Sequence, residues 1–320
     1  MTIRVGVDAV VSEELLKYFT REVQVIRIPE QPEGEIEVDF WFPAMSPSVV
    51  RRQWSHLKGV QVVQIPWAGV DSLRKVFPPG VIFCDAQGVH DIPTAEWAMA
   101  AILAMEKCLP FFVEQQRQSH WAVGQQANQN DAHPHTKIKN PPAPIREIAD
   151  STVLIVGYGS IGKAIEARLE PFGAKFLRVA RHARAGVDAV SRLEELLGQA
   201  DIVVLTLPLT SETRHLMNAQ RLGTMKPGAL LVNAARGPIV DTDALLQSLN
   251  ENRIRAALDV TDPEPLPSDH PLWKAPNLLI TPHVAGDSVR FMQRAFRLAG
   301  EQAARYARGE PLRNVVTGEY

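Results

Sequence analysis

The sequence predicts an α/β protein with two open parallel-sheet domains. Short runs of β-branched and apolar residues alternate along the chain with segments of helical pattern. This order is typical of parallel sheets, because each parallel strand pair needs a crossover, which is usually helical. One run, residues 152–156, continues into a glycine-rich turn and another helical pattern. At 320 residues the chain is long enough to build two hydrophobic cores.

The N-terminal ~90 residues predict a domain of their own, since strands and helices already alternate there. Ser12 is the expected N-cap of the first helix, because serine readily accepts from the free N–H groups at a helix start. The expected strands are 3–7, 23–28, 38–42 and 60–65, and the expected helices are 12–18 and 49–57.

A long apolar segment and a long polar segment follow. Residues 93–105 are apolar on nearly every side of a helix, so this helix must be covered, by a crossing between domains or by a subunit interface. Residues 115–149 are rich in Gln, Asn, His and Pro and predict a long connection. His133 and His135 lie in it, and we expect solvated side chains rather than a metal site.

The remainder predicts a doubly wound nucleotide-binding domain, because strands again alternate with helices. An amphipathic helix is expected last, over 289–306. The expected strands are 152–156, 174–179, 201–205, 229–233, 256–260 and 278–280, and helices 191–197, 218–225 and 241–250 lie between them.

The turn after residues 152–156 carries the pattern G-x-G-x-x-G. Gly157 permits the tight turn, Gly159 lets the backbone approach a pyrophosphate, and Gly162 lets the next helix pack close to the strand. The N–H groups and the positive dipole end at the start of that helix can then hold the phosphates. A bland glycine turn is the alternative, but a strand before the motif and a helix after it predict dinucleotide binding.

Composition limits the partners. Apolar residues make up 45% and charged residues 22%, which is ordinary for a soluble globular protein. The net charge of −2 gives no electrostatic reason to expect nucleic acid or a membrane surface. No apolar run reaches ~18 residues, and the start does not resemble a signal peptide, so we expect a cytoplasmic protein. Cys84 and Cys108 lie among apolar residues and are expected to be buried thiols.

Three charged or titratable residues follow late strands of the second domain. Arg236, Glu264 and His283 each lie just beyond a predicted strand, at the edge where open α/β sheets bind ligands. An arginine can bind a carboxylate, a histidine can exchange a proton near neutral pH, and a glutamate beside it favours the imidazolium. With a dinucleotide, this set suits hydride transfer at the alcohol carbon of a 2-hydroxy acid. Each residue alone could instead be a cap partner, a turn residue or a core histidine.

Over nearly its whole length the chain resembles the D-isomer-specific 2-hydroxyacid dehydrogenases. The resemblance implies that Arg236 binds the substrate carboxylate and oxo group, that His283 exchanges the proton, and that Glu264 is the partner of the histidine. The motifs that carry it are Gly157-Tyr-Gly-Ser-Ile-Gly162, Leu207-Pro-Leu-Thr210, Met225-Lys-Pro-Gly-Ala-Leu-Leu-Val-Asn-Ala-Ala-Arg-Gly237, Ala257-Leu-Asp-Val260, Glu264-Pro265 and Thr281-Pro-His283.

The resemblance also implies the cofactor site, in which Asp259 holds the nicotinamide carboxamide. NAD-preferring sites carry an acidic residue about 20 residues past the first glycine. Ala180 stands there and arginines follow, as in NADP-using glyoxylate and hydroxypyruvate reductases, so we predict NADP, with NAD and a solvated basic loop as the alternative. The predicted cofactor-binding residues are Gly157, Tyr158, Gly159, Ser160, Ile161, Gly162, Arg181, Arg184, Pro208, Ala235 and Asp259.

Residues 64–71 resemble the loop whose backbone N–H groups hold the substrate carboxylate in this family. Trp67 could wall the substrate pocket or could equally be a core residue behind the loop. Phosphoglycerate-oxidising relatives commonly place an arginine at the position of Ile65, so its absence argues against a phosphorylated substrate. The predicted substrate-binding residues are Trp67, Ala68, Gly69, Arg236 and His283.

The resemblance further implies a discontinuous arrangement. Residues 1–98 and 289–320 are the expected flavodoxin-like substrate-binding domain, residues 99–288 are the expected Rossmann domain, and the active site is expected in the cleft between them. Family members are usually dimers built through their nucleotide domains. We therefore expect a homodimer that covers the apolar helix near Trp97.

These inferences predict an NADP(H)-preferring D-2-hydroxyacid dehydrogenase that reduces small, unphosphorylated 2-oxo acids, similar to the glyoxylate and hydroxypyruvate reductases. An NAD-dependent D-2-hydroxyacid or phosphoglycerate dehydrogenase is the alternative within the same class. A dinucleotide-sensing, corepressor-like interaction protein is the alternative of another class, because a fold does not fix a function.

Overall fold

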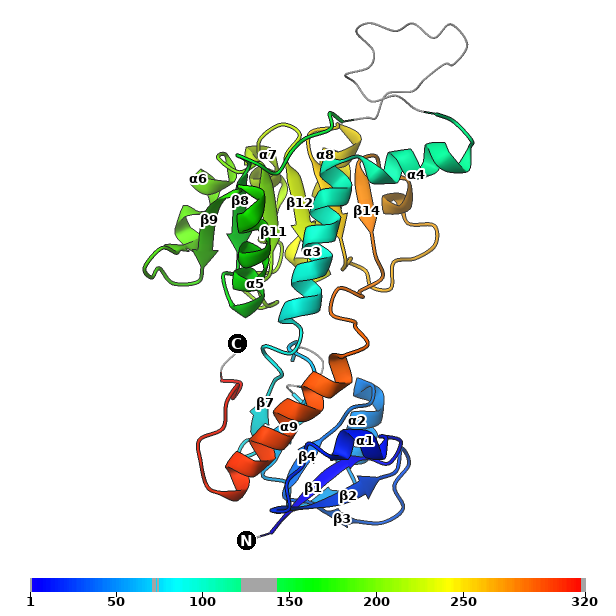
Figure 1. Ribbon diagram of the computed structural model, residues 1–320, viewed down its shortest axis with the longest axis vertical. Coiled ribbons are helices and arrows are strands. Elements are labelled where there is room, and N and C mark those ends of the chain that lie inside the picture. Colours follow the sequence, from blue (N-terminus) through cyan, green and yellow to red (C-terminus); the bar gives the residue numbers. More distant parts are fainter. Residues whose placement is uncertain (1, 71–72, 74, 122–142, 318–320) are drawn as a thin grey trace, which may run out of the picture. The chain divides into compact units, whose positions relative to one another are not determined.

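The computed structural model describes residues 2–70, 73, 75–121 and 143–317 (Figure 1). The chain divides into two compact units, unit 1 (Met1–Asp91 with Asp287–Tyr320) and unit 2 (Ile92–Gly286). The sequence placed these divisions after residues 98 and 288. The structure divides earlier at the first point, because the long apolar helix α3 (Asp91–Glu106) packs on the sheet of unit 2. The roles of the two units stay predictions.

Unit 1 contains a five-stranded parallel sheet in the order β2-β1-β4-β6-β7. Numbered along the sheet's own strands this order is 2-1-3-4-5, which is the flavodoxin-like arrangement and confirms the predicted class. A separate two-stranded parallel pair joins β3 (Ile36–Glu37) and β5 (Leu57–Lys58). The strands of the main sheet are β1 (Ile3–Asp8), β2 (Val23–Ile28), β4 (Phe40–Phe42), β6 (Val62–Gln64) and β7 (Ile82–Cys84).

Helices cover both faces of this sheet. On one face α1 (Glu13–Leu16) packs with the C-terminal helix α9 (Phe291–Ala307), and on the other lies α2 (Pro47–Trp54) (Figure 1). The rings of Phe296 in α9 and Phe42 in β4 meet edge to face, 4.9 Å apart. The C-terminal helix therefore completes the core that the N-terminal strands begin, which is why unit 1 is discontinuous.

Helix α1 differs from its prediction. Ser12 precedes α1, but its side chain makes no capping hydrogen bond. The backbone N–H of Leu15 instead donates to the backbone carbonyl of Ser12, over 3.1 Å. The helix ends at Leu16 because Tyr18 and Phe19 donate to carbonyls only three residues back, which tightens the chain out of the α-helix.

Unit 2 is built on a seven-stranded parallel sheet in the order β10-β9-β8-β11-β12-β13-β14. The order reverses at β8, as in doubly wound Rossmann folds, and confirms the predicted fold class. The strands are β8 (Thr152–Val156), β9 (Lys175–Ala180), β10 (Asp188–Ala189), β11 (Ile202–Leu205), β12 (Leu230–Asn233), β13 (Arg255–Leu258) and β14 (Leu278–Ile280).

Two layers of helices enclose this sheet. Helices α3 and α5 (Ser160–Leu169) cover one face, and α6 (Leu193–Leu197), α7 (Ala219–Thr224) and α8 (Thr242–Asn250) cover the other (Figure 1). Ile155 faces the first layer and its neighbour Leu154 the second, as strand alternation requires. Short 3₁₀ turns span Glu170–Phe172, Val190–Arg192, Gly237–Ile239 and Pro271–Lys274.

The region after α3 only partly matches the predicted connection. A further helix, α4 (Leu109–Arg117), extends into the stretch that was expected to be irregular from residue 115. His133 and His135 lie outside the described residues, so their expected exposure stays a prediction. Cys84 and Cys108 are buried free thiols, as the sequence predicts. In the described part of the chain no helix has the length and apolarity needed to cross a bilayer.

Candidate active site

The glycine turn between β8 and α5 has the geometry that a dinucleotide needs. Gly157 has φ of +95°, and a Cβ on it would lie 2.7 Å from Leu207. A Cβ on Gly162 would lie 3.0 Å from Ile155, so the glycine allows α5 to approach its strand. A Cβ on Gly159 would meet nothing closer than 3.9 Å, which leaves open space beside the backbone. The loop therefore fits a pyrophosphate at the N-terminus of α5.

Charged side chains surround Tyr158, the second residue of the glycine motif. Arg178 binds Glu166 through two hydrogen bonds of 2.6 Å, and its guanidinium lies 5.6 Å from the Tyr158 ring. Arg178 holds the pKa of Glu166 below its usual range, and partial burial raises the pKa of the Tyr158 phenol. Arg184 donates to the Tyr158 carbonyl and lies over the same ring at 6.0 Å. Arg184 is thereby held against the glycine loop.

The end of β9 carries Ala180 where an acidic residue would select NAD. Arg181 follows, and its Nη2 donates to Glu212 Oε1 over 2.9 Å, with side chains 60% and 63% exposed. Glu212 lies in the loop after β11, the loop that also contains Pro208. Thr213 donates to the Pro208 carbonyl over 2.7 Å and so fixes that loop. Glu212 was not among the predicted residues, and no local pattern in the sequence signals its contact with Arg181.

Arg236 is positioned by the turn that follows β12. Asn233 Oδ1 accepts from the N–H of Ala235, and Asn233 Nδ2 donates to the carbonyl of Arg236, both over 3.0 Å. One side-chain amide thus holds the turn at both ends. The Arg236 guanidinium donates to the Ala235 carbonyl over 2.7 Å and is only partly buried, and a guanidinium is a group that can bind an anion.

His283 and Glu264, which the sequence separates by 19 residues, lie together. His283 Nδ1 and Glu264 Oε1 are 2.6 Å apart, and the side chains are 45% and 41% exposed. A carboxylate on Nδ1 leaves Nε2 available for proton exchange and stabilises the imidazolium. The pair can therefore act as a general acid–base group.

Asp259 is buried, and its backbone carbonyl accepts from the N–H of His283 over 2.7 Å. Its Oδ1 accepts from the Thr281 hydroxyl over 2.6 Å and from the N–H of Val284 over 2.9 Å, while Oδ2 accepts from the N–H of Ala285 over 2.8 Å. Each carboxylate oxygen has two acceptor positions, so Oδ2 keeps one for a further donor such as a carboxamide. The role predicted for Asp259 is compatible with these contacts, but they also give it a structural one.

The predicted substrate loop belongs to unit 1. Trp67 is half-buried and packs against the core cluster of that unit, and its carbonyl accepts from the N–H of Ala86 over 3.0 Å. Ala68 and Gly69 follow it and are also only partly buried. Ile65 is fully buried in the core. Asp71, the last residue of the motif, lies outside the described residues.

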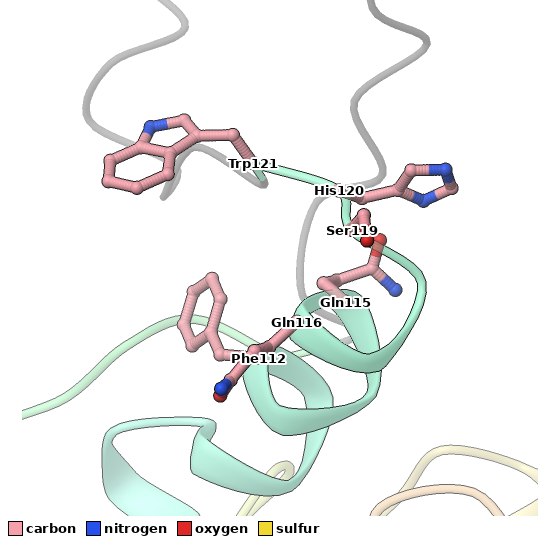
Figure 2. A pocket seen from close by; sticks show the side chains of 6 residues that line it. All are labelled: Phe112, Gln115, Gln116, Ser119, His120 and Trp121. Carbon is pink, nitrogen blue, oxygen red and sulfur yellow. The ribbon is translucent and has the colours of Figure 1, made fainter.

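A hollow on unit 2 lies at the carboxyl end of α4. Figure 2 shows the rings of Phe112 and Trp121 on one side of this end of the helix, with His120 turned the other way. Trp121 is 87% exposed. None of the predicted site residues lines the hollow, so it is no part of the candidate active site. Among the described residues no cluster of His, Cys, Asp or Glu is placed to hold a metal ion.

The fold and this site define a nicotinamide-dinucleotide oxidoreductase. Residues 99–285 match the family model described as the D-isomer specific 2-hydroxyacid dehydrogenase, NAD binding domain. That region contains the glycine motif and the Arg236, Glu264 and His283 set. The chain belongs to the D-isomer-specific 2-hydroxyacid dehydrogenase family, whose members act on the CH–OH group of donors.

Similar sequences and solved structures agree with this family assignment. An uncharacterized protein in the proB 3′ region of Corynebacterium melassecola is 34% identical over 81% of this chain and 83% of its own length. A glyoxylate reductase of Thermofilum pendens is 42% identical over 51% of this chain and 50% of its own length. The crystal structure of a D-isomer specific 2-hydroxyacid dehydrogenase from Xanthobacter autotrophicus Py2, in complex with NADPH and MES, is 29% identical with a TM-score of 0.79, and the match covers 99% of this chain and 98% of that one.

Proposed function

We propose that the protein is an NADP(H)-preferring reductase of small, unphosphorylated 2-oxo acids of the glyoxylate and hydroxypyruvate type. The observation that carries the proposal is the 2.6 Å contact of His283 with Glu264 in a chain whose glycine turn fits a dinucleotide. The similarity to the glyoxylate reductase of Thermofilum pendens supports the substrate class.

The chemistry of the proposal divides among three side chains. The nicotinamide, when bound, supplies hydride to the oxo carbon. Arg236 binds the carboxylate of the substrate and polarises its oxo group, since a guanidinium can bind two oxygens at once. His283 donates a proton from Nε2 to the oxo oxygen, which gives the 2-hydroxy acid. Glu264 holds Nδ1–H and stabilises the imidazolium before the proton leaves.

The preference for NADP is supported at the end of β9. Ala180 places no carboxylate where the 2′-phosphate would lie. Arg181 and Arg184 follow Ala180 within four residues of the chain. The similar structure from Xanthobacter autotrophicus holds NADPH. One observation favours the NAD alternative, because Glu212 lies 2.9 Å from Arg181 and would repel a phosphate. In that case the exposed side chain of Arg181 would discriminate little between NADP and NAD.

A phosphoglycerate dehydrogenase and a dinucleotide sensor are both less well supported. Ile65 is buried in the core of unit 1, so this position offers no cation to a phosphorylated substrate such as phosphoglycerate. A dinucleotide-sensing, corepressor-like protein would not need a proton-exchanging pair, and the His283–Glu264 pair therefore favours an enzyme.

One assay tests the proposal. A panel of 2-oxo acids, with and without phosphate groups, is reduced with NADPH and with NADH separately. We expect steady turnover of glyoxylate or hydroxypyruvate, with kcat/KM for NADPH at least about tenfold above that for NADH, the effect of one charged hydrogen bond. Nucleotide-dependent binding of a protein partner without any turnover would support the sensor instead, and better use of phosphorylated acids would support the phosphoglycerate dehydrogenase.

We also propose that the protein is a homodimer built through unit 2. The proposed roles of the units are unchanged: unit 1 binds the substrate and unit 2 binds the dinucleotide. The large apolar side chains of Ile92 in α3, and of Leu109 and Val113 in α4, are exposed. Trp121, which follows the end of α4, is exposed as well (Figure 2). A second copy would remove this surface from water. Sedimentation equilibrium should give twice the mass of the chain, and a monomer at micromolar concentration would count against this assembly. The cytoplasmic location stays a prediction.

A further inference from the structure

The backbone segment that begins at His283 is hydrogen-bonded to one buried residue, Asp259. His283 has φ of +57°, in the left-handed region that non-glycine residues seldom adopt, and its N–H donates to the carbonyl of Asp259 over 2.7 Å. The next two N–H groups, of Val284 and Ala285, donate to the Asp259 carboxylate. Three successive N–H groups therefore end on Asp259, and their bonds offset the cost of the left-handed conformation.

A relay of two further side chains fixes the carboxylate itself. Trp97 Nε1 on α3 donates to Thr281 Oγ1 over 2.9 Å, and Thr281 Oγ1 lies 2.6 Å from Asp259 Oδ1. The indole N–H can only donate, and a hydroxyl has a single hydrogen. When Trp97 occupies an acceptor position of the Thr281 oxygen, the Thr281 hydrogen remains directed at Asp259. The Trp97 N–H therefore donates to the Thr281 hydroxyl, and the Thr281 hydroxyl donates to the Asp259 carboxylate.

The catalytic pair needs such support, because its own surroundings supply little. The side chains of His283 and Glu264 are almost half exposed, so packing does not fix their rotamers. Their 2.6 Å contact depends on where the backbone of His283 is placed. A loose supporting shell would leave the imidazole present but misplaced, which lowers turnover more than binding.

We infer that Trp97 and Thr281 are positioning residues for His283 and act through Asp259. The inference rests on the proposed function, in which His283 exchanges the proton with the substrate. Neither residue contacts the reacting atoms in this account. Asp259 then has two roles, since it anchors the His283 segment as well as offering Oδ2 to a carboxamide. The alternative is a purely structural role for Trp97. In that case its ring packs against the core cluster of α3 and α5, and its N–H has no effect on His283.

The test is a double-mutant cycle on the two relay residues. Thr281→Val keeps the shape of the side chain and removes the hydroxyl, Thr281→Ser restores the hydroxyl, and Trp97→Phe keeps an aromatic ring and removes the donor. We expect Thr281→Val to lower kcat about tenfold, while the Kd of NADPH stays within about twofold, and Thr281→Ser to recover most of the loss. Trp97→Phe should lower kcat when Thr281 is present and have no further effect beside Thr281→Val, because it acts through that hydroxyl.

The outcomes separate this inference from the proposed function. If His283→Ala keeps its activity, the proposed proton donor is wrong and the inference falls with it. If His283→Ala is inactive while Thr281→Val turns over like wild type, only the inference is overturned. Equal losses from Trp97→Phe in both backgrounds would identify its role as packing and would also overturn the relay. If Thr281→Val fails to fold, Trp97→Phe is the test. A lower kcat at unchanged thermal stability and NADPH affinity would support the relay, and an unchanged kcat would overturn it.

Discussion

Gly237 lies so close to Thr261 that a Cβ on residue 237 would be 1.9 Å from the Thr261 carbonyl oxygen. Gly237 follows Arg236, and Thr261 begins the segment that leads to Glu264. The φ of Gly237 is not positive, so space rather than backbone conformation requires glycine here. This close approach brings two segments of the candidate site side by side.

Gly237→Ala should therefore damage both stability and activity. The methyl group would collide with backbone atoms that cannot rotate away, and overpacking of this kind costs roughly 1–3 kcal/mol or more. The two segments must separate, so kcat/KM should also fall. Gly223→Ala is a matched control, because a Cβ there meets nothing within 4 Å and alanine favours the helix. Urea unfolding of both variants checks this, and equal stabilities would contradict it.

Removal of the imidazole should abolish most turnover and spare cofactor binding. A general acid contributes ~10²–10⁴-fold, so His283→Ala should lower kcat by that order while NADPH still binds. Glu264→Gln should lower kcat less, because an amide oxygen can still accept from Nδ1–H but carries no charge to stabilise the imidazolium. Steady-state rates and NADPH fluorescence titration measure both effects. His56→Ala in unit 1 serves as the control, and near-wild-type rates for His283→Ala would exclude His283 as the proton donor.

The order of the main elements could be predicted because each depends on a local pattern. Residues 152–156 are apolar and β-branched, and β8 has the same bounds. Not every short strand could be predicted this way. Strand β14 has only three residues and has its predicted bounds. Strands β7, also of three residues, and β10, of two, were not expected, and they are defined by pairing with β6 and β9.

The candidate site shows the same division. Residues placed just beyond a strand, such as Arg236 and His283, could be predicted because the edge of a parallel sheet follows from strand order. Their supporting partners could not. Glu212 is 31 positions from Arg181, and Trp97 is 184 positions from Thr281. Such contacts depend on how a loop or a helix packs in three dimensions, and no spacing in the sequence encodes them.

Asp85 should make the stability of unit 1 depend on pH. It follows β7, is 7% exposed, and accepts from the N–H of Gln87 over 2.9 Å. Burial raises the pKa of Asp85 from 3.8 to about 6. Between these values the folded chain holds a proton that the unfolded chain has lost, so stability falls as pH rises from about 4 through 6. Asparagine keeps the acceptor for Gln87 and removes the charge.

Asp85→Asn should accordingly stabilise the protein at pH 7.5 by up to about 3 kcal/mol, the equivalent of this pKa difference, and have little effect at pH 4. Denaturant unfolding of wild type and variant at both pH values measures the difference, in which all other titrating groups cancel. The same difference in stability at both pH values would mean that Asp85 does not titrate in this range.

The contact between Arg181 and Glu212 should tune the choice of cofactor. If NADP binds as proposed, its 2′-phosphate competes with the Glu212 carboxylate for Arg181, and the two anions repel each other. An exposed ion pair is worth ~0.2–1 kcal/mol, so Glu212→Gln should raise the NADPH/NADH ratio of kcat/KM by up to about fivefold. Glu195→Gln is the control, because Glu195 forms a similarly exposed pair with Arg192 in the same unit.

Substitution of the arginine should act in the opposite direction. Arg181→Ala removes the partner of the phosphate and should lower the ratio by roughly ten- to hundredfold. Ala180→Asp combined with Arg181→Ala should reverse the preference, because the new carboxylate accepts from the ribose hydroxyls and repels a phosphate. Rates with both cofactors, at low and high salt, measure each ratio. Equal or better use of NADH by wild type would refute the NADP assignment, whereas an unchanged ratio in Glu212→Gln would refute only the competition at Arg181.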